Sequence, residues 1–249
     1  MSTKNPAESK CAESEDRASP SENIRCTIIG DEKVGKTSLL LSYQSNTYSS
    51  EYIPTVFDIY SKRDAYKDAP INFSLYDIGG KQKFDKLEHH GLSDHQGHQG
   101  TDVFLLCFSV DDRKSFENIS KIWMHQILNY YILSEDSVDG NAKQTNSVLD
   151  PYLVLPIIIL VGCKNDMRLQ KPLLQEIAKV RRHSVPSKSA PQNRNSPIVT
   201  SKEAMHLSRA IKAYKYMECC ARRGTGIEKI FNEVTKAVLE RREYVSIKR

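Results

Sequence analysis

A stretch of the chain close to its amino end has the residue types and spacing of a phosphate-binding loop. Residues 30–37 read Gly-Asp-Glu-Lys-Val-Gly-Lys-Thr, which fits G-x-x-x-x-G-K-[ST] in full. Glycine lets the main chain wrap around a triphosphate, and N–H groups at a helix start attract the anion. The alternative, a chance match on a turn, is disfavoured by the apolar run 24–29 before the loop and the helical pattern 38–43 after it. The residues expected to contact the nucleotide from this loop are Asp31, Glu32, Lys33, Val34, Gly35, Lys36, Thr37 and Ser38.

The ends of this loop carry the chemistry. Lys36 would reach the β- and γ-phosphates, and the Thr37 hydroxyl would bind Mg²⁺. A second signal is Asp77, which begins Asp-Ile-Gly-Gly at the end of an apolar run. An aspartate there holds Mg²⁺ through water, and the Gly80 main chain brings an N–H to the γ-phosphate. The alternative is a surface aspartate that matches by chance.

A third motif, Cys-Lys-Asn-Asp at 163–166, follows the apolar run 156–162. The Asp166 carboxylate can accept both the ring N–H and the exocyclic amine of guanine. Adenine presents the wrong donors, so this site would reject ATP. The aliphatic stem of Lys164 can cover the base. A strand-end turn capped by Asp166 is the simpler alternative.

Composition bounds the class of protein. The chain has 249 residues, 39% of them hydrophobic and 27% charged, and a formal net charge of +5, which suits a soluble globular domain. No dense Lys/Arg stripe interleaves with aromatic residues, so nucleic-acid binding is not expected. None of the six cysteines forms a C-x-x-C pair, which favours a reducing, cytoplasmic location. No apolar run is long enough to span a bilayer.

Strand-like and helix-like segments alternate from residue 24 onward. This alternation predicts an α/β fold with a mixed, mostly parallel six-stranded sheet and helices on both faces. The stretch 56–65 is the most polar of the strand candidates and suits an edge. Strands are predicted at 24–29, 56–65, 70–77, 103–109, 156–162 and 214–219, and helices at 36–44, 114–132, 201–213 and 227–243.

The domain boundaries follow from composition. Residues 1–22 are rich in Ser, Glu, Lys and Pro and are expected to be a disordered tail. Residues 23–243 form one domain, and 244–249 are expected to be a short tail. Polar insertions are expected near 89–100, 134–150 and 167–200. The first contains His89, His90, His95 and His98, whose spacing fits no standard zinc pattern, so a solvated loop is preferred to a metal site.

With these motifs in order, the chain resembles the small GTPases of the Ras superfamily, most closely the Rho family, over about residues 23–240. Tyr-Ile-Pro-Thr-Val-Phe at 52–57 is similar to the first switch of Rho proteins. The sequences at 102–110, 115–119 and 216–221 are also similar to those of Rho proteins. The segment 167–200 falls where Rho proteins carry an insert helix. The resemblance implies the small-GTPase form of the phosphate-loop NTPase fold.

The resemblance also implies residue roles. Thr55 would bind Mg²⁺ and the γ-phosphate, so that the first switch closes only in the GTP state. Tyr48 would pack against the guanine. Cys220 and Ala221 would lie under the base, with the Ala221 amide contacting its oxygen, and Arg222 is expected beside them. The implied magnesium ligands are Thr37, Thr55 and Asp77.

Four positions depart from the family pattern. Lys81 stands where the family has the glutamine that orients the attacking water, and a lysine cannot accept a hydrogen bond from water. Glu32 replaces a loop glycine and should obstruct an arginine finger; finger and glutamine together supply about 10⁵-fold acceleration. We therefore expect very slow or absent GTP hydrolysis and insensitivity to activating proteins. Cys163 and Cys220 replace better hydrogen-bonding residues, so nucleotide affinity should be weaker and exchange faster.

The sequence therefore predicts an atypical Rho-like switch that binds GTP or GDP with Mg²⁺ and is mostly GTP-bound. Its expected partners are effector proteins at the switch loops near 48–60 and 77–100, and exchange factors. No C-a-a-X box is present, so membrane association should be weak, peripheral and electrostatic, and the protein should be a monomer. The main alternative is a pseudo-GTPase scaffold with weak or no turnover. An ATP-using enzyme is disfavoured because it would leave Asp166 without a role.

Overall fold

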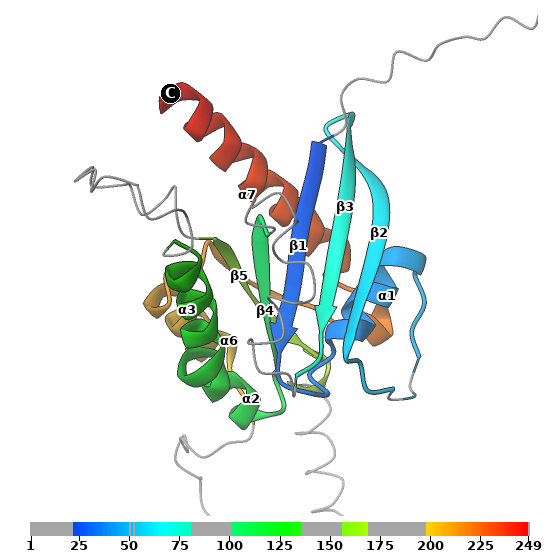
Figure 1. Cartoon of the computed structure of the whole chain (residues 1–249). Helices are drawn as coiled ribbons and strands as arrows, with labels where there is room; N and C mark the ends of the chain where they lie inside the picture. Colours follow the sequence, from blue (N-terminus) through cyan, green and yellow to red (C-terminus); the bar gives the residue numbers. More distant parts are fainter. Residues whose placement is uncertain are drawn as a thin grey trace, which may run out of the picture.

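The computed structural model describes residues 22–49, 51, 53–80, 101–135, 156–168 and 198–248. These residues form one six-stranded sheet in the order β2-β3-β1-β4-β5-β6. Within the described residues the β2–β3 pair is antiparallel and the other pairs are parallel, as Figure 1 shows. This arrangement confirms the predicted mixed sheet with 56–65 at an edge. The strands are β1 (Glu22–Gly30), β2 (Phe57–Tyr66), β3 (Ala69–Ile78), β4 (Val103–Ser109), β5 (Ile157–Cys163) and β6 (Lys215–Glu218).

The helices alternate with the parallel strands, as the sequence pattern indicates. Gly35 precedes α1, Asp112 caps α2 through its carboxylate, and Thr200 with Glu203 forms a capping box at the start of α6. The helices are α1 (Lys36–Ser45), α2 (Arg113–Asn118), η3 (Ile119–Trp123, a π-helical turn), α3 (Met124–Glu135), α6 (Ser201–Ala210), η4 (Ala221–Arg223, a 3₁₀ turn) and α7 (Ile227–Lys248).

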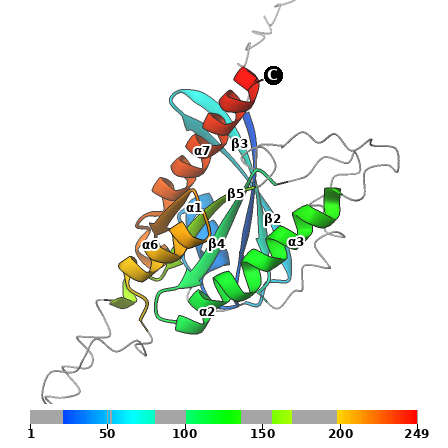
Figure 2. The ribbon, with the colours of Figure 1, turned by 90° about the vertical axis from the view of Figure 1, so that its left-hand side faces the viewer.

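Two hydrophobic cores lie on opposite faces of the sheet. On one face, α1 and α7 pack against alternate residues of β1, β3 and β4, and the Tyr43 and Phe231 rings stack with centroids 3.6 Å apart. On the other face, Trp123 and Ile127 from η3 and α3 and Ala204 from α6 pack against β4 and β5. Figure 2 shows α7 and α3 on opposite sides of the sheet. β4 is therefore buried throughout, as its continuous apolar run predicts.

The parallel strands bring the predicted motifs to one edge of the sheet. The phosphate loop follows β1, Asp77 lies near the end of β3, and Lys164 follows β5. In the strand register, Ile28 of β1 is opposite Asp77, and Ser109 of β4 is opposite Cys163. Because the carboxyl ends of parallel strands meet at the same edge, residues far apart in sequence converge there.

Several predicted boundaries are corrected by the structure. The helix expected over 114–132 is divided by the π-turn η3 and continues to Glu135. Strand β1 begins at Glu22, the last residue of the expected tail. The short tail expected at 244–249 is helical up to residue 248, because α7 continues to Lys248. The remaining tail 1–21, the His-rich insertion and most of the other two insertions lie outside the described residues.

Candidate functional site

The loop between β1 and α1 turns sharply at its two glycines. Gly30 has φ 145° and Gly35 has φ 112°, a region that side chains rarely adopt. A Cβ on Gly30 would also lie 2.1 Å from the Cys107 carbonyl oxygen of β4. The first glycine is therefore required by close approach to the neighbouring strand. Lys33 also has a positive φ, of 61°, so the loop curves through an ordinary residue as well.

The Lys36 side chain is 6% exposed and folds back over the loop. Its Nζ donates to the carbonyl oxygens of Gly30, at 2.9 Å, and Asp31, at 2.8 Å. Burial lowers the pKa of Lys36, and the negative charge of Asp77 is the main opposing influence. A nearby phosphate would restore favourable charge to this buried ammonium.

Two threonines and one aspartate meet across the sheet edge. Thr37 Oγ1 donates to Asp77 Oδ2 at 2.5 Å, and the hydroxyls of Thr37 and Thr55 are 2.9 Å apart. Asp77 is fully buried, and burial raises its pKa. Its second oxygen, Oδ1, is buried without a hydrogen-bond partner among the described residues. An orphaned carboxylate oxygen beside two hydroxyls is a set of hard oxygen ligands and fits Mg²⁺.

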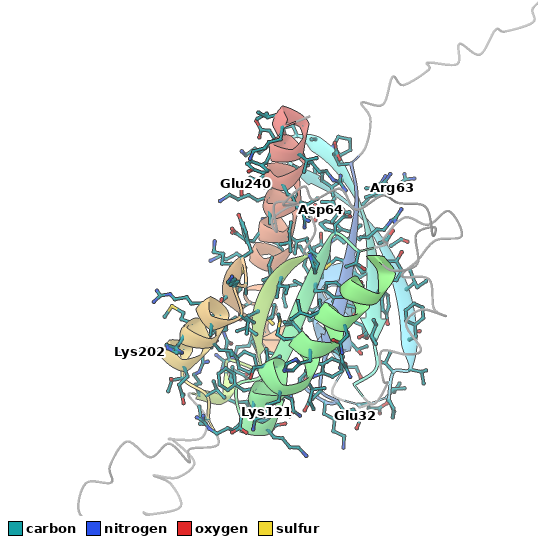
Figure 3. All side chains as sticks on the ribbon, turned by 60° about the vertical axis from the view of Figure 1, so that its left-hand side comes forward. Glu32, Arg63, Asp64, Lys121, Lys202 and Glu240 are labelled. Atoms are coloured by element: carbon teal, nitrogen blue, oxygen red, sulfur yellow. The ribbon has the colours of Figure 1, made fainter. Side chains whose placement is uncertain are left out.

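A cavity of about 630 Å³ opens beside these groups. Its size is that of a small-molecule site. Figure 3 shows Glu32, on its wall, at the same end of the molecule as Lys121 of η3. The walls come from the phosphate loop, the segment before β2, the two glycines after β3, and one lysine after β5. The predicted site residues in this lining are Glu32, Lys33, Gly35, Lys36, Thr37, Ser38, Tyr48, Thr55, Gly80 and Lys164.

The glycine pair after β3 connects the two sides of this cavity. A Cβ on Gly79 would lie 2.2 Å from the Thr55 carbonyl oxygen, and the Gly79 N–H bonds to the Val56 carbonyl at 3.0 Å. A Cβ on Gly80 would lie 2.2 Å from the Glu32 nitrogen. The main chain after β3 therefore contacts both the phosphate loop and the segment that carries Thr55. Sequence reasoning assigned Gly80 a role but missed Gly79.

Lys164 joins the Cys-Lys-Asn-Asp motif to the phosphate loop. It has φ 57°, and its Nζ donates to the Lys33 carbonyl oxygen at 2.6 Å. Its Cε lies 4.0 Å from the Cβ position of Gly35, so its stem runs along the loop.

Five residues of the expected base site are outside the lining of the cavity, namely Cys163, Asp166, Cys220, Ala221 and Arg222. Asp166 is 6% exposed, and Cys163 and Cys220 are buried. The Cys220 thiol shares a hydrogen bond with Asp166, and the pKa of Cys220 is raised by burial and by this contact. Ala221 is half-buried and Arg222 is exposed, both in η4. Tyr48, expected against the base, does line the cavity and is 46% exposed.

Cys163 belongs to a cluster of buried free thiols. Its sulfur lies 3.9 Å from that of Cys219, and it also accepts a hydrogen bond from Cys107. These thiol hydrogen bonds lower the pKa of Cys163 and raise that of Cys107. The three sulfurs come from the ends of β4, β5 and β6, so Cys163 fills a tightly packed space.

A network of polar side chains that sequence reasoning missed supports the base-site turn. The Arg168 guanidinium pairs with Glu218 and donates to the Val199 carbonyl at 2.8 Å and to the Tyr216 hydroxyl at 3.3 Å. Glu218 also accepts from Ser201 Oγ at 2.8 Å. Arg168 is therefore a link from the turn to β6 and α6. Its place two residues after Asp166 is the only sequence signal for it.

Two expected loop contacts come out differently. Asp31 and Val34 are not in the cavity lining: Val34 is 1% exposed, and the Asp31 carboxylate bonds to Asn118 and Trp123. Lys81 and the histidines of 89–100 lie outside the described residues. Among the residues that the structure describes, no group of three or more His, Cys, Asp or Glu is placed to hold a metal. In the same part of the chain, no helix has the length and apolarity needed to cross a membrane.

Comparison with known protein families agrees with this arrangement. The model of the Ras family matches residues 25–240, which include the phosphate loop, the Asp77 segment and the Cys-Lys-Asn-Asp motif. Proteins of this family bind GTP and GDP together with Mg²⁺. The sheet order and the placement of the motifs at one sheet edge are those of the small-GTPase fold. The chain therefore belongs to the Ras family and is a small GTP-binding protein.

Proposed function

We propose that this protein is a Rho-like small GTP-binding protein that acts as a GTP-dependent switch with impaired GTP hydrolysis. The observation that carries the proposal is the meeting of Thr37, Thr55 and Asp77: the two threonines line the cavity, and the Asp77 carboxylate lies behind them, with its Oδ1 buried and unpartnered among the described residues. These three residues would hold Mg²⁺. When bound, Mg²⁺ would neutralise charge on the phosphates.

The phosphates would lie along the loop. Its main-chain N–H groups and the start of α1 provide donors, and the buried Lys36 ammonium provides a positive charge. Thr55 would close over the γ-phosphate, and Gly79 and Gly80 would transmit its presence, because their main chain touches both sides of the cavity. Loss of the γ-phosphate would release both segments.

The base would be read by Asp166, with Lys164 covering one face and Ala221 contacting the guanine oxygen. Asp166 shares a hydrogen bond with the Cys220 thiol, a weak donor that holds the carboxylate less firmly than a hydroxyl would. The Cys163 thiol is hydrogen-bonded to another buried thiol, that of Cys219, and would contribute little to holding the phosphate loop. Both features support weak binding and fast exchange, and because cells hold more GTP than GDP, exchange would favour the GTP state.

Impaired hydrolysis rests on two side chains. Lys81 has donors and no acceptor, so it cannot orient an attacking water as glutamine does. Glu32 lines the cavity, and its main-chain nitrogen is next to Gly80, so its side chain would obstruct an arginine finger that reached the γ-phosphate. We expect insensitivity to activating proteins.

Effector proteins would bind the segment before β2 and along this edge strand. Ile53, Val56 and Ile59 are 75%, 62% and 58% exposed, which is unusual for side chains of this size. Ile53 and Val56 are within two residues of Thr55, so the γ-phosphate would control their arrangement. Exchange factors would use the same face together with the residues near 77–100.

A second candidate function is a pseudo-GTPase scaffold that turns over little or no nucleotide. The observation that favours it is the burial of Asp166, Cys163 and Cys220 outside the lining of the cavity. Such a protein would present the same exposed face to partners without switching.

The nucleotide content of the purified protein tests the proposal and separates it from the scaffold. Nucleotide is released by denaturation and resolved by ion-exchange chromatography. Mostly GTP supports the switch with impaired hydrolysis, and mostly GDP overturns the impairment. If no nucleotide is found, binding of a fluorescent GTP analogue with Mg²⁺ is measured next. Binding that GTP competes and ATP does not would retain the GTP site, whereas no binding favours the scaffold.

A further inference from the structure

The Asp31 carboxylate accepts hydrogen bonds from two side chains of the α2–η3 segment, Asn118 and Trp123. Its Oδ1 accepts from the Trp123 indole Nε1 at 2.7 Å, and its Oδ2 accepts from Asn118 Nδ2 at 2.6 Å. Trp123 is 3% exposed and belongs to the core with Ile29 and Phe104. It is also the one tryptophan of the chain. Both oxygens of a phosphate-loop side chain are therefore bound to a buried, rigid support.

The π-turn explains how both donors reach the same carboxylate. Asn118 and Trp123 are five residues apart. In a regular α-helix, at 3.6 residues per turn, side chains five apart point about 140° away from each other. In η3 the Met124 N–H bonds to the Ile119 carbonyl, five residues back, so five residues approach one full turn. The widened turn brings Asn118 and Trp123 toward one face of the helix, where both can reach Asp31.

The main chain of Asp31 is in contact with the groups proposed to meet the phosphates. Its carbonyl accepts from Lys36 Nζ at 2.8 Å. A Cβ on Gly80 would lie 2.4 Å from the Asp31 carbonyl carbon. A peptide located between Lys36 and Gly80 is fixed by its own side chain, and that side chain is fixed by Asn118 and Trp123. The Asp31 charge also favours the charged form of Lys36 and opposes the lowering of the Lys36 pKa by burial.

We propose that Asn118 and Trp123 are positioning residues for the phosphate loop, and that Trp123 emission reports whether the loop holds a nucleotide. This inference rests on the proposed binding of GTP and GDP. Loss of either donor would leave a carboxylate oxygen of Asp31 unpaired, and the Asp31–Glu32 peptide could then turn away from Lys36 and Gly80. A hydrogen bond to a charged group is strong enough for its loss to be seen in a rate.

The experiment uses the full chain with radiolabelled GDP and Mg²⁺. Trp123→Phe keeps the aromatic ring and removes the N–H, and we expect GDP to dissociate about tenfold faster, equivalent to about 1.4 kcal/mol. Asn118→Ala removes the second donor without touching the aromatic core, so it tests the same idea if Trp123→Phe does not fold. We expect it to accelerate dissociation by about threefold to tenfold.

The control is Ile119→Val, a cavity-forming change at a fully buried side chain of the same π-turn that does not bond to Asp31. It should lower the melting temperature and leave the GDP dissociation rate unchanged. In the native protein, the tryptophan emission spectrum should differ between the GDP-bound and nucleotide-free forms. Asp31→Asn should reduce that difference. Its NH₂ group replaces one of the two carboxylate oxygens, so the side chain can no longer accept hydrogen bonds from both Asn118 and Trp123.

The outcomes separate this inference from the function it rests on. If the native protein binds no GDP, the proposed function and the inference both fail. If the native protein binds GDP and both variants release it at the native rate, the positioning role alone is overturned. Faster release in the Ile119→Val control to the same extent as in the variants would also overturn it, because general destabilisation would explain the effect.

Discussion

Thr37 and Asp77 are 40 residues apart in the chain, yet the Thr37 hydroxyl donates a 2.5 Å hydrogen bond to the Asp77 carboxylate at the edge of the sheet. The contact exists because β1 and β3 are parallel neighbours, with Ile28 opposite Asp77. Among the residues that the structure describes, the Oδ1 of this buried carboxylate has no hydrogen-bond partner, so a bound cation would be favourable there.

Removing this charge should change the dependence on magnesium. Asp77→Asn should weaken nucleotide binding in the presence of Mg²⁺ by about tenfold or more, because a neutral amide is a poor ligand for a hard cation. The native and variant affinities should be similar when Mg²⁺ is chelated. Asp68→Asn, an exposed change in the β2–β3 turn, is the control. An equal loss with and without Mg²⁺ would contradict the assignment of Asp77 to the metal.

The same carboxylate should give a pH dependence of defined sign. The pKa of Asp77 is raised by burial, so the folded, metal-free protein binds a proton more readily than the unfolded chain. Stability from this group is therefore lost as pH rises from the ordinary aspartate pKa through the raised one. Mg²⁺ affinity should show the opposite trend and fall on acidification, because a proton competes for the carboxylate. Urea unfolding and Mg²⁺ titration across acidic pH measure both trends, which should be absent in Asp77→Asn.

Turnover should be recoverable by restoring two residues. Lys81→Gln together with Glu32→Gly should raise the intrinsic GTP hydrolysis rate by at least about tenfold, because a side chain able to orient water returns and the cavity wall is cleared. Lys202→Gln, an exposed change on α6, removes the same kind of charge away from the cavity and should have no effect. Single-turnover assays with radiolabelled GTP give the rates. A native rate already equal to that of the double variant would remove the basis for impaired hydrolysis.

Cys220→Ser should slow nucleotide release. A hydroxyl is a stronger hydrogen-bond donor than a thiol, so it should hold the buried Asp166 carboxylate more firmly. We expect GDP dissociation to slow by about threefold to tenfold. Cys26→Ser is the matched control, because Cys26 is also a buried free thiol but lies in β1 away from the base-site turn. Equal effects of the two substitutions on the dissociation rate would show that Cys220 has no special role.

Arg168→Met should destabilise the domain by about 2 kcal/mol, because it leaves the half-buried Glu218 without its cation. The hydrogen bonds that Glu218 accepts from Tyr216, Arg168 and Ser201 hold its pKa below the usual value, against the effect of burial. For a lowered pKa, stability is present above the unfolded pKa and is lost as pH falls through the folded one. The variant should lose less stability on acidification than the native chain. Lys121→Met, which breaks an exposed pair with Glu117, should change neither quantity measurably.

The sequence alone determined the kind of site and most of the elements. The phosphate loop at 30–37 can be recognised from its own residues. Any such loop needs glycines at its turns and a lysine and a hydroxyl at the start of the helix, whatever surrounds it. The apolar run at 103–109 predicted a central strand, and the polar run at 56–65 predicted an edge, because burial on two faces or one leaves a direct record in composition.

Tertiary structure decided the contacts between elements. The short-range pattern around Asp31 says nothing about Trp123, which lies 92 residues away and reaches it only because a π-turn rotates one side of the helix toward the loop. The tail expected after residue 243 is helical as far as Lys248, as an extension of α7 beyond its last buried residue, Val238. The thiol contacts of Cys163 and the salt bridge of Arg168 likewise depend on strand order. Residue types record what a segment needs, whereas the packing of strands and helices sets which partner supplies it.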